Sequence, residues 1–250
     1  MEGVKNNMLY METDLHTHTI ASDHAYCTLL EMVSYAKEAG LKLIATTDHA
    51  PAIGDAPHIW HFHNLKAIPR KVFGVYVLRG VEANIIAADG TLDVDEHTLK
   101  MLDIGIASYH GGIFQPGTVA QNTEAYLKIL ENPYIDFIAH SGSPDFAYDY
   151  DVVLKRAREL GKLIEINEHT FSVRRRNVEN CKTIAKKCME YGVGVVVNTD
   201  AHICFDMGHY EGTTAMFAEL GFPEELIVNQ TVDRLMAYLN SRPGREKIEF

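Results

Sequence analysis

The strongest constraint on the fold is a regular alternation between short apolar runs and longer helical patterns along the 250 residues. Runs rich in β-branched and apolar residues predict seven strands, at 9–15, 41–47, 75–81, 104–108, 137–139, 163–166 and 193–198. Between them, apolar residues at i, i+3, i+4 and i+7 predict helices at 28–39, 118–130, 152–160 and 178–191. Strands that alternate with helices form a parallel sheet, either open or closed into a barrel.

The sequence predicts one domain over residues 1–250, because no stretch rich in Pro, Gly or Ser divides it. Glycines end several helical patterns, as at Gly161 and Gly192, which is typical of helix C-termini. Three segments depart from the regular pattern. We expect an irregular segment at 50–64, a C-terminal helix pair at 223–228 and 231–240, and a loosely held tail from about 242 to 250.

The composition narrows the class of protein. With 46% hydrophobic residues the chain resembles an ordinary soluble domain, and its formal net charge of −11 argues against charge-driven binding to nucleic acid or an anionic membrane. No apolar run is long enough for a membrane span, and the start resembles no secretory signal, so we expect a cytoplasmic protein. The four cysteines lack disulfide-like or zinc-like spacing and are predicted to be free thiols. Oligomeric state is left open.

Histidine is unusually frequent, with 13 residues, and its distribution follows the predicted strands. Side chains able to bind metal lie at the C-terminal ends of six of the seven predicted strands, and His24 follows the first of them. The complete set is His16, His18, His24, His49, Glu82, His110, His140, Asp200 and His202. Because parallel α/β folds build their sites at this end of the strands, we expect these side chains to converge.

The spacing and number of these residues predict a metal cluster. Residues i and i+2 of an extended chain share a face, which pairs His16 with His18 and Asp200 with His202. One strand-end histidine is more often a hydrogen-bonded core residue, but nine candidate ligands at one end exceed what a single ion uses and suit two or three ions. Glu82 is the natural bridge, because a carboxylate offers two oxygens.

The ordered motifs also resemble a known family, the PHP (polymerase and histidinol phosphatase) superfamily. The motifs that carry the resemblance are DLHTH at 14–18, TDH at 47–49, GVEA at 80–83, single histidines after the fourth and fifth strands, and DAH at 200–202. ASDHAY at 21–26 and DAPHIWHF at 55–62 are similar to the YcdX-like bacterial phosphatase branch of that superfamily.

The resemblance implies a single-domain, distorted, TIM-like (β/α)7 barrel with a trinuclear metal site at the C-terminal ends of its strands, and phosphoesterase activity. It implies that His16, His18, Glu82 and Asp200 hold one ion, and that Glu82, His110 and His140 hold a second. The third ion would be held by His24, His49 and His202. Zinc is our first expectation, with manganese and iron as alternatives.

A charge count predicts the substrate class. The net charge of the expected site is about +3, summed over seven neutral imidazoles, two carboxylates, three divalent ions and one bridging hydroxide. A site with this charge suits a phosphate monoester dianion. We therefore predict a metal-dependent phosphatase in which a metal-bridging hydroxide, held beside Glu82, attacks phosphorus. Ligation alone explains Asp200, although this carboxylate is also a candidate to handle the proton.

Substrate contacts are predicted less directly. The resemblance favours His61, within the irregular segment, and Arg70, just after it, as substrate-binding residues. The alternative is that this segment is only a packed aromatic loop. Arg175, with Arg174 and Arg176, is a candidate to bind a second phosphate, or else part of a solvated basic turn. Departures from the branch pattern at 111–112 and at Glu168-His169 leave the identity of the ester open.

Three rival functions remain at the level of sequence. The first is a phosphodiesterase or 3′ exonuclease, which needs a basic track that a charge of −11 makes less favourable. The second is an amide or lactone hydrolase with a metal-bridging modified lysine, but no lysine falls at a strand end. The third is a non-catalytic metal-binding protein, which would have closed, fully protein-ligated sites. The preferred partner is a small phosphorylated substrate.

Overall fold

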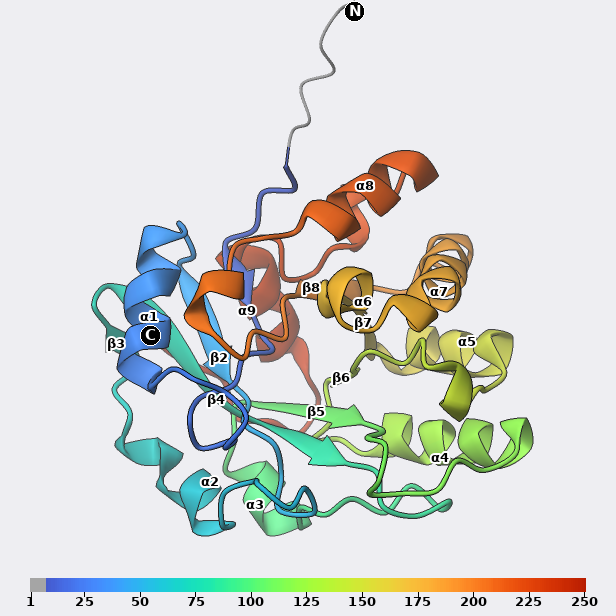
Figure 1. The fold of residues 1–250 in the computed structure, drawn as a ribbon, viewed down its shortest axis with the longest axis horizontal. Helices are drawn as coiled ribbons and strands as arrows, with labels where there is room; N and C mark the ends of the chain where they lie inside the picture. Colours follow the sequence, from blue (N-terminus) through green and yellow to red (C-terminus); the bar gives the residue numbers. More distant parts are fainter. Residues whose placement is uncertain (1–7) are drawn as a thin grey trace, which may run out of the picture.

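A sheet of parallel strands forms the centre of the computed structural model, which describes residues 8–250 (Figure 1). The parallel strands lie in the order β1 (Thr13–Asp14), β2 (Leu43–Thr46), β4 (Val75–Asn84), β5 (Ile104–Ser108), β6 (Phe137–Ile138), β7 (Leu163–Asn167) and β8 (Val195–Asn198). Each of the seven predicted strands is therefore confirmed, with shorter bounds in several cases.

The first and last strands approach each other and nearly close the sheet. The backbone N–H of Leu15 donates to Oδ1 of Asn198 at 2.9 Å, and Thr17 forms a parallel bridge with Ala201 just beyond the strand ends. The expected distorted (β/α)7 barrel is confirmed as a nearly closed, single-domain barrel of seven parallel strands. An extra strand that we did not predict, β3 (Lys71–Val72), pairs antiparallel with the start of β4.

The long strand β4 links the two halves of the barrel. Its first part pairs with β2, where Leu43 lies opposite Tyr76, and its second part pairs with β5, where Gly80 lies opposite Ile104. At this changeover Gly80 has no room for a side chain, because a Cβ would lie 2.6 Å from a methyl of Ile104 and 2.7 Å from a methyl of Thr47. The missing side chain at Gly80 lets β4 pass close to its neighbours and continue to Glu82.

Helices surround the strands, and their ends follow local signals in the sequence (Figure 1). The longer helices are α1 (Leu29–Glu38), α4 (Val119–Glu131), α5 (Tyr150–Leu160), α7 (Val178–Tyr191), α8 (Glu211–Leu220) and α9 (Val232–Ser241). Thr28 with Glu31, and Thr118 with Gln121, form capping boxes that start α1 and α4. Gly161 and Gly192 end α5 and α7 in the left-handed conformation, as predicted.

Apolar side chains fill the N-terminal half of the barrel. Leu43 and Ala45 of β2 belong to the interior cluster, whereas Ile44 packs outward against the α1 side. Helix α9 covers this end and inserts Leu235 and Leu239, both fully buried, into the interior cluster. The polar residues of the motifs are thus left to the opposite, C-terminal end of the strands.

The first half of the expected C-terminal helix pair was predicted wrongly. Residues 223–228 contain only the single 3-10 turn η5 (Glu224–Leu226), because the chain then runs beside β8. The N–H of Val228 donates to the carbonyl of Val195 at 2.8 Å, and Ile227 forms a parallel bridge to Val195. These bonds to β8 hold the segment in an extended conformation that a helix could not adopt.

The tail from 242 to 250 also differs from the expected loose segment, because it packs against the N-terminal end of the barrel. The guanidinium of Arg242 forms an ion pair with Asp136 at 2.7 Å, with both side chains nearly inaccessible to solvent. Ile248 is buried, and its N–H donates to Oδ1 of Asn240 at 2.8 Å. Local composition could not reveal these partners, which lie more than 100 positions away in the case of Asp136.

Shorter elements complete the described chain. The irregular segment contains α2 (Trp60–Asn64) and leads into η1 (Leu65–Ala67); the others are α3 (Glu96–Lys100), η2 (Pro144–Phe146), α6 (His169–Ser172), η3 (Arg175–Asn177) and η4 (Cys204–Asp206). The four cysteines are free and buried, as predicted. Within residues 8–250, the helices are too short or too polar to cross a membrane.

Removal of the ion pair between the tail and Asp136 should lower the free energy of unfolding measurably. Arg242→Ala leaves the buried carboxylate of Asp136 without its cation, so we expect the free energy of unfolding to fall by about 3–5 kcal/mol in urea titrations. The control is Arg156→Ala, which removes a solvent-exposed pair with Glu159 and should leave the free energy of unfolding nearly unchanged. Equal, small effects of the two substitutions would mean that the tail adds little to the fold.

Candidate metal centre

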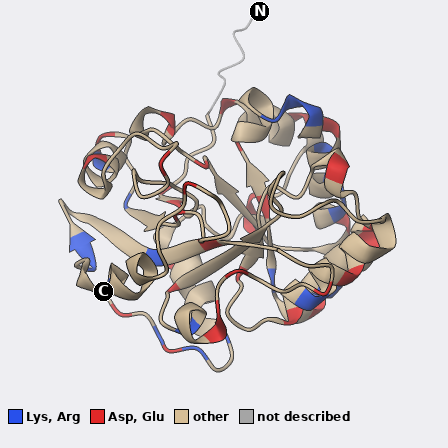
Figure 2. Ribbon diagram, turned by 60° about the horizontal axis from the view of Figure 1, so that its bottom comes forward, with Lys and Arg blue, Asp and Glu red and all other residues tan. Residues whose placement is uncertain are grey.

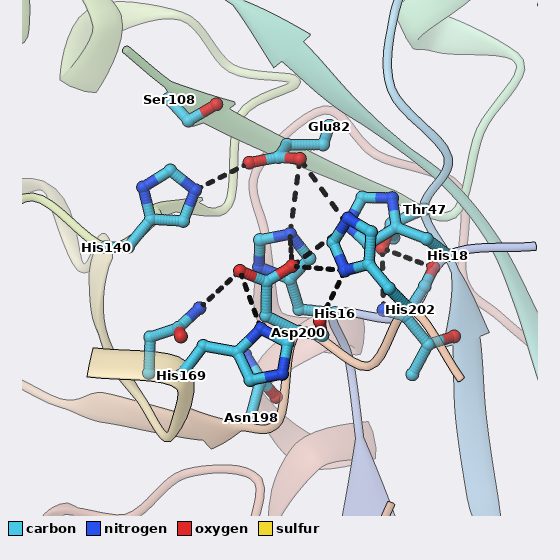
Figure 3. Close-up of polar contacts among 12 residues, drawn as sticks. His16, His18, Thr47, Glu82, Ser108, His140, His169, Asn198, Asp200 and His202 are labelled. Carbon is cyan, nitrogen blue, oxygen red and sulfur yellow. Dashed lines mark hydrogen bonds and ion pairs between the residues drawn. The ribbon is translucent and has the colours of Figure 1, made fainter. Parts of the chain in front are cut away.

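The nine candidate ligands come from both sides of the barrel and gather at the C-terminal ends of its strands. Figure 3 labels six of them: His16, His18, Glu82, His140, Asp200 and His202. Glu82 belongs to β4 itself, and the others follow the strands: His16, His18 and His24 after β1, His49 after β2, His110 after β5, His140 after β6, and Asp200 and His202 after β8. This is the convergence that the parallel topology predicts, since these ends share one mouth.

Glu82 lies at the middle of the cluster and is completely buried. Its Oε1 lies 2.9 Å from Nε2 of His140, and its Oε2 lies 2.7 Å from Nδ1 of His49 and 3.3 Å from Nε2 of His16. The two oxygens therefore face different imidazoles, which is the arrangement a bridging carboxylate needs.

Asp200 provides the second central carboxylate. Its Oδ1 lies 3.1 Å from Nε2 of His18 and 3.5 Å from Nε2 of His16, and both imidazoles are buried. Asp200 has a φ of +60° and His140 a φ of +28°, conformations that side chains with a Cβ rarely adopt. Backbone strain at two candidate ligands is typical of a functional site, where the surrounding fold overrides local backbone preference.

Hydrogen bonds turn several imidazoles so that one nitrogen faces the centre. Nδ1 of His16 lies 2.8 Å from Glu165, and Nδ1 of His110 lies 2.6 Å from Oδ1 of Asn84. In each ring Nε2 then points inward, is buried, and makes no hydrogen bond to any part of residues 8–250. Orienting a ligand imidazole through its other nitrogen is how proteins prepare histidine for a metal.

His24 and His202 are likewise held through their Nδ1 atoms, and their Nε2 atoms face each other. Nδ1 of His24 bonds Asp55 at 2.6 Å and Nδ1 of His202 bonds the carbonyl of Asp200 at 2.8 Å, so both Nε2 atoms carry lone pairs. These two Nε2 atoms face each other at 3.0 Å. Two lone pairs at this distance repel unless a cation or a proton lies between them, so the pair fits a metal ion.

Compact groups of three ligand atoms, each within 4.8 Å of the others, recur across the centre. They are His18, His49 and His202; His16, His18 and Asp200; His16, Glu82 and His140; His49, Glu82 and His110; and His169, Asp200 and His202. Eight of the nine expected ligands take part in these groups, and His24 joins through its contact with His202. Imidazole and carboxylate ligands at this density suit several first-row or zinc ions.

Negative charge is concentrated in this mouth. Burial opposes ionisation of Glu82, but His110, His16 and His49 outweigh it and hold the pKa of that carboxyl well below its usual range. Burial likewise opposes protonation of His16, yet Glu165, Asp200 and Glu82 raise the pKa of this imidazole well above its usual value. A buried group of ionised carboxylates that raises an imidazole pKa is an environment that attracts cations.

Glu165 of β7 is a site residue that the motifs did not reveal. It is buried and accepts four hydrogen bonds, from Nδ1 of His16, the backbone N–H of His140, and the amides of Asn167 and Asn198, at 2.8 to 2.9 Å. Strand β7, the one parallel strand that carries no candidate ligand, thus contributes a carboxylate that orients two of them. Its signal in the sequence is a lone charged residue inside the wholly buried run Leu163–Asn167.

Asp48 and His61 lie beside the centre. Asp48 accepts hydrogen bonds from the N–H of Thr19 at 2.7 Å and from the hydroxyl of Ser22 at 2.9 Å, so it fixes the loop that carries His24. Nε2 of His61 lies 3.3 Å from Asp48. His61 lines a separate cavity beside Leu29 and Pro69, so its nearest link to the centre runs through Asp48.

Arg70 does not reach the centre. Its guanidinium pairs with Asp103, the residue just before β5, at the N-terminal end of the barrel. The prediction that Arg70 contacts substrate is therefore corrected: β3, which starts at the next residue, pairs with the start of β4 and holds Arg70 at the far end. A local signal of this added strand is Gly74, which with Phe73 forms the two-residue turn between β3 and β4.

The residues after β7 divide between structure and site. Glu168 accepts hydrogen bonds from the N–H groups of Gly212 and Thr213 at 2.7 and 2.9 Å, and so caps α8. His169 instead faces the centre, with Nδ1 3.9 Å from Asp200 and Nε2 3.3 Å from Asp206. Arg174 donates to Oδ2 of Asp200 at 2.7 Å, on the side away from His18.

Comparison with known proteins decides the family. The PHP domain matches residues 14–169, which is more than half of the chain and contains seven of the nine candidate ligands. The chain belongs to the PHP domain family. A probable phosphatase of Clostridium novyi is 44% identical over 230 residues, covering 92% of this chain and 94% of that one. A probable phosphatase of Caldanaerobacter subterraneus subsp. tengcongensis is 46% identical over 239 residues, covering 95% and 94%.

A solved structure agrees with the PHP fold. The histidinol phosphate phosphatase of Lactococcus lactis, crystallised with zinc, L-histidinol and phosphate, superposes with a TM-score of 0.57. It is 15% identical, and the match covers 85% of this chain and 95% of that one. At this identity the likeness extends to the barrel architecture alone.

Glu165 yields a prediction about stability and pH. Glu165→Gln cannot accept all four hydrogen bonds, so we expect about 3–5 kcal/mol less unfolding free energy at pH 7. Burial opposes ionisation of Glu165, but His16 outweighs it and lowers the pKa of this carboxyl from 4.5. Its stabilisation is therefore present above pH 4.5 and is lost as the pH falls through the lower, folded-state pKa.

Urea titrations of chelator-treated protein at pH 7, and from about pH 5 to about pH 3, measure both effects. Wild type should lose more stability than Glu165→Gln as the pH falls through that window. Glu159→Gln, which alters an exposed ion pair, serves as the control. Parallel pH curves for wild type and Glu165→Gln would contradict the role given to this carboxylate.

Proposed function

We propose that the chain is a metal-dependent phosphatase that hydrolyses small phosphate monoesters. The observation that carries the proposal is the set of inward-facing nitrogen and oxygen atoms at one mouth of the barrel, several of them buried without a hydrogen bond within residues 8–250. Membership of the PHP family and the names of relatives 44 to 46% identical, each a probable phosphatase, support the same reaction class.

Three divalent ions fit the ligand set in this proposal. His16, His18, Glu82 and Asp200 would hold the first, and Glu82, His110 and His140 the second. His24, His49 and His202 would hold the third, which would lie between the facing Nε2 atoms of His24 and His202. Zinc is the preferred ion, because imidazole suits it and because the L. lactis relative in fold was crystallised with it; manganese and iron are alternatives.

Charge favours phosphate over neutral substrates. Seven neutral imidazoles and two carboxylates contribute −2, three divalent ions contribute +6, and one hydroxide contributes −1, which leaves about +3. Arg174 adds a further positive charge beside Asp200. A phosphate dianion gains more from such a mouth than an amide or a lactone does.

The protein side chains act by orientation and by charge. Bound divalent ions would lower the pKa of a coordinated water toward about 7 and neutralise charge on the phosphoryl oxygens. Glu165, Asn84 and Asp55 hold the imidazoles of His16, His110 and His24 by their outer nitrogens, so the rings need no rearrangement when substrate arrives. Arg174 lies where its guanidinium can also contact a phosphoryl oxygen.

The rival functions have less support. For a nuclease, Lys and Arg would need to form a long track toward the mouth. Figure 2 instead shows most of them scattered among acidic residues around the ribbon, and the run at 174–176 beside the mouth is too short for such a track. For a lysine-bridged hydrolase, Lys162 is poorly placed, since its ammonium donates to the carbonyl of Asn132 at the N-terminal end of β7. For a metal store, ligand sets would be closed to solvent, whereas a cavity of about 390 Å³ adjoins His24, His49, His110 and His202.

Removing the central carboxylate tests the bridge. Glu82→Gln should reduce bound metal by at least one ion per chain and lower phosphatase turnover by about 10²-fold or more, because an amide cannot join two cations. Metal analysis by mass spectrometry and assays on p-nitrophenyl phosphate measure both effects. Glu124→Gln, on the exposed surface of α4, is the matched control. A variant at Glu82 that keeps its full rate would refute the bridge.

Metal removal tests the reaction class itself. Purified protein should contain about three tightly bound ions per chain, lose hydrolysis of phosphate monoesters on treatment with a chelator, and regain it with zinc, manganese or iron. Activity that survives complete removal of metal would contradict the proposal. So would protein that never binds more than about one ion under any loading condition.

A further inference from the structure

Two cavities open side by side at the mouth of the barrel. The first, about 390 Å³, lies over the imidazoles of the candidate centre, and the second, about 300 Å³, extends toward η3. His110, Gly111 and Arg174 line both cavities and form their common wall. A ligand whose reacting group lies over the candidate centre can therefore extend past this wall into the second cavity.

The second cavity is basic, although the protein as a whole is acidic. Arg174, Arg175 and Arg176 all line it. Among its lining residues the carboxylate is that of Asp145, which lies 3.2 Å from Arg176 in an exposed pair. Arg174 also pairs with Asp200, so three guanidinium groups face two carboxylates, and the net positive charge is that of Arg175, whose guanidinium forms no ion pair within residues 8–250.

The segment that presents these arginines is ordered by its own hydrogen bonds. The N–H groups of Val173 and Arg174 donate to the carbonyl of His169 at 2.9 Å, and the N–H of Asn177 donates to the carbonyl of Arg174 at 2.8 Å. Asn180 then ties the segment to the carbonyl of Gly142 at 2.9 Å. Guanidinium groups on an anchored segment lose less entropy when they bind an anion than groups on a free loop.

Aromatic rings border the same cavity. Tyr109 stacks on Phe146 with ring centroids 4.5 Å apart, and both residues line the space. The hydroxyl of Tyr109 is buried without a hydrogen-bond partner in residues 8–250. The two rings therefore give the basic cavity an uncharged aromatic border.

We propose that the substrate carries a second anionic group, a phosphate or a carboxylate, on its leaving alcohol, and that Arg175 and Arg176 recognise it in the second cavity. This inference rests on the proposed phosphatase function and narrows its substrate class. Planar guanidinium groups match the geometry of both anions and bind them through paired hydrogen bonds.

The same charge argues against a cationic leaving group. L-histidinol, with which the L. lactis enzyme was crystallised, carries an amine that is positively charged at neutral pH. In this chain such a group would meet the guanidinium groups that line the second cavity, above all the unpaired Arg175, and like charges oppose binding. The barrel architecture shared with that enzyme therefore does not extend to its substrate.

A matched series of esters with a three-methylene spacer tests the inference with the metal-loaded, full-length protein. The probes are propane-1,3-diol bisphosphate, 4-(phosphonooxy)butanoate, 3-hydroxypropyl phosphate and 3-aminopropyl phosphate. We expect kcat/KM for the bisphosphate or the carboxylate to exceed that for the hydroxypropyl ester about tenfold or more, with the aminopropyl ester slowest. The first two probes distinguish a phosphate from a carboxylate.

Variants connect the preference to the arginines. In Arg175→Ala/Arg176→Ala the ratio of kcat/KM for the anionic and hydroxypropyl esters should fall toward one, and Arg175→Glu should shift the ratio toward the aminopropyl ester. Arg158→Ala, an exposed arginine near the C-terminal end of α5, is the matched control and should keep the wild-type ratio. An unchanged ratio in the double variant would overturn the inference.

A binding measurement keeps the inference independent of turnover. Calorimetry should show propane-1,3-bisphosphonate binding more tightly than propylphosphonate to wild-type protein, and losing that advantage in the double variant. If no ester is hydrolysed under any metal condition, the proposed function fails, while the calorimetric comparison still decides the second site. If esters are hydrolysed with equal kcat/KM whatever their far end, the inference fails and the phosphatase function stands.

Discussion

The interaction on which the candidate site depends is the orientation of buried imidazoles around two carboxylates, Glu82 and Asp200. An imidazole that can rotate has no fixed lone pair, so each ring needs a partner on its outer nitrogen. Glu165 provides it for His16 and Asn84 provides it for His110. These partners lie on different strands from the rings they hold, so the strand register determines whether nitrogen atoms point inward.

The register of β4 and β5 illustrates this dependence. Glu82 lies opposite Ile106, and Asn84 lies opposite Ser108, two residues before His110. A shift of one residue would turn Glu82 and Asn84 away from the interior, because successive side chains of a strand face opposite sides. The apolar half of the barrel resists such a shift, since Leu43, Phe137 and Leu163 pack under α9 at the other end. Packing at one end thus maintains the geometry at the other.

Local pattern and parallel topology were enough to predict the strands and most of the candidate ligands. Strand-end residues such as His16, His49 and Asp200 could be predicted to meet, because the C-terminal ends of parallel strands share one mouth. Contacts that depend on partners far away in the sequence could not be predicted. Arg242 pairs with Asp136, more than 100 positions away, and β3 holds Arg70 at the N-terminal end of the barrel, opposite the candidate centre. Glu165 lies between these cases, since its charge within a buried run marks it as unusual but does not name its partners.

Selectivity among esters has to arise outside the candidate ligand set. In the proposed reaction the cations held by these side chains would contact the phosphoryl group, which every phosphate monoester shares, so they would lower the barrier for different esters alike. Discrimination needs contacts with the leaving alcohol, and the proposed second anion site would supply them from the segment after β7. Arg174 belongs to both parts, because it bonds Asp200 and lines both cavities. An anion bound by Arg175 and Arg176 would also attract the guanidinium of Arg174, which bonds Asp200. Binding of the leaving group would thereby act on the hydrogen bond to a carboxylate of the candidate centre.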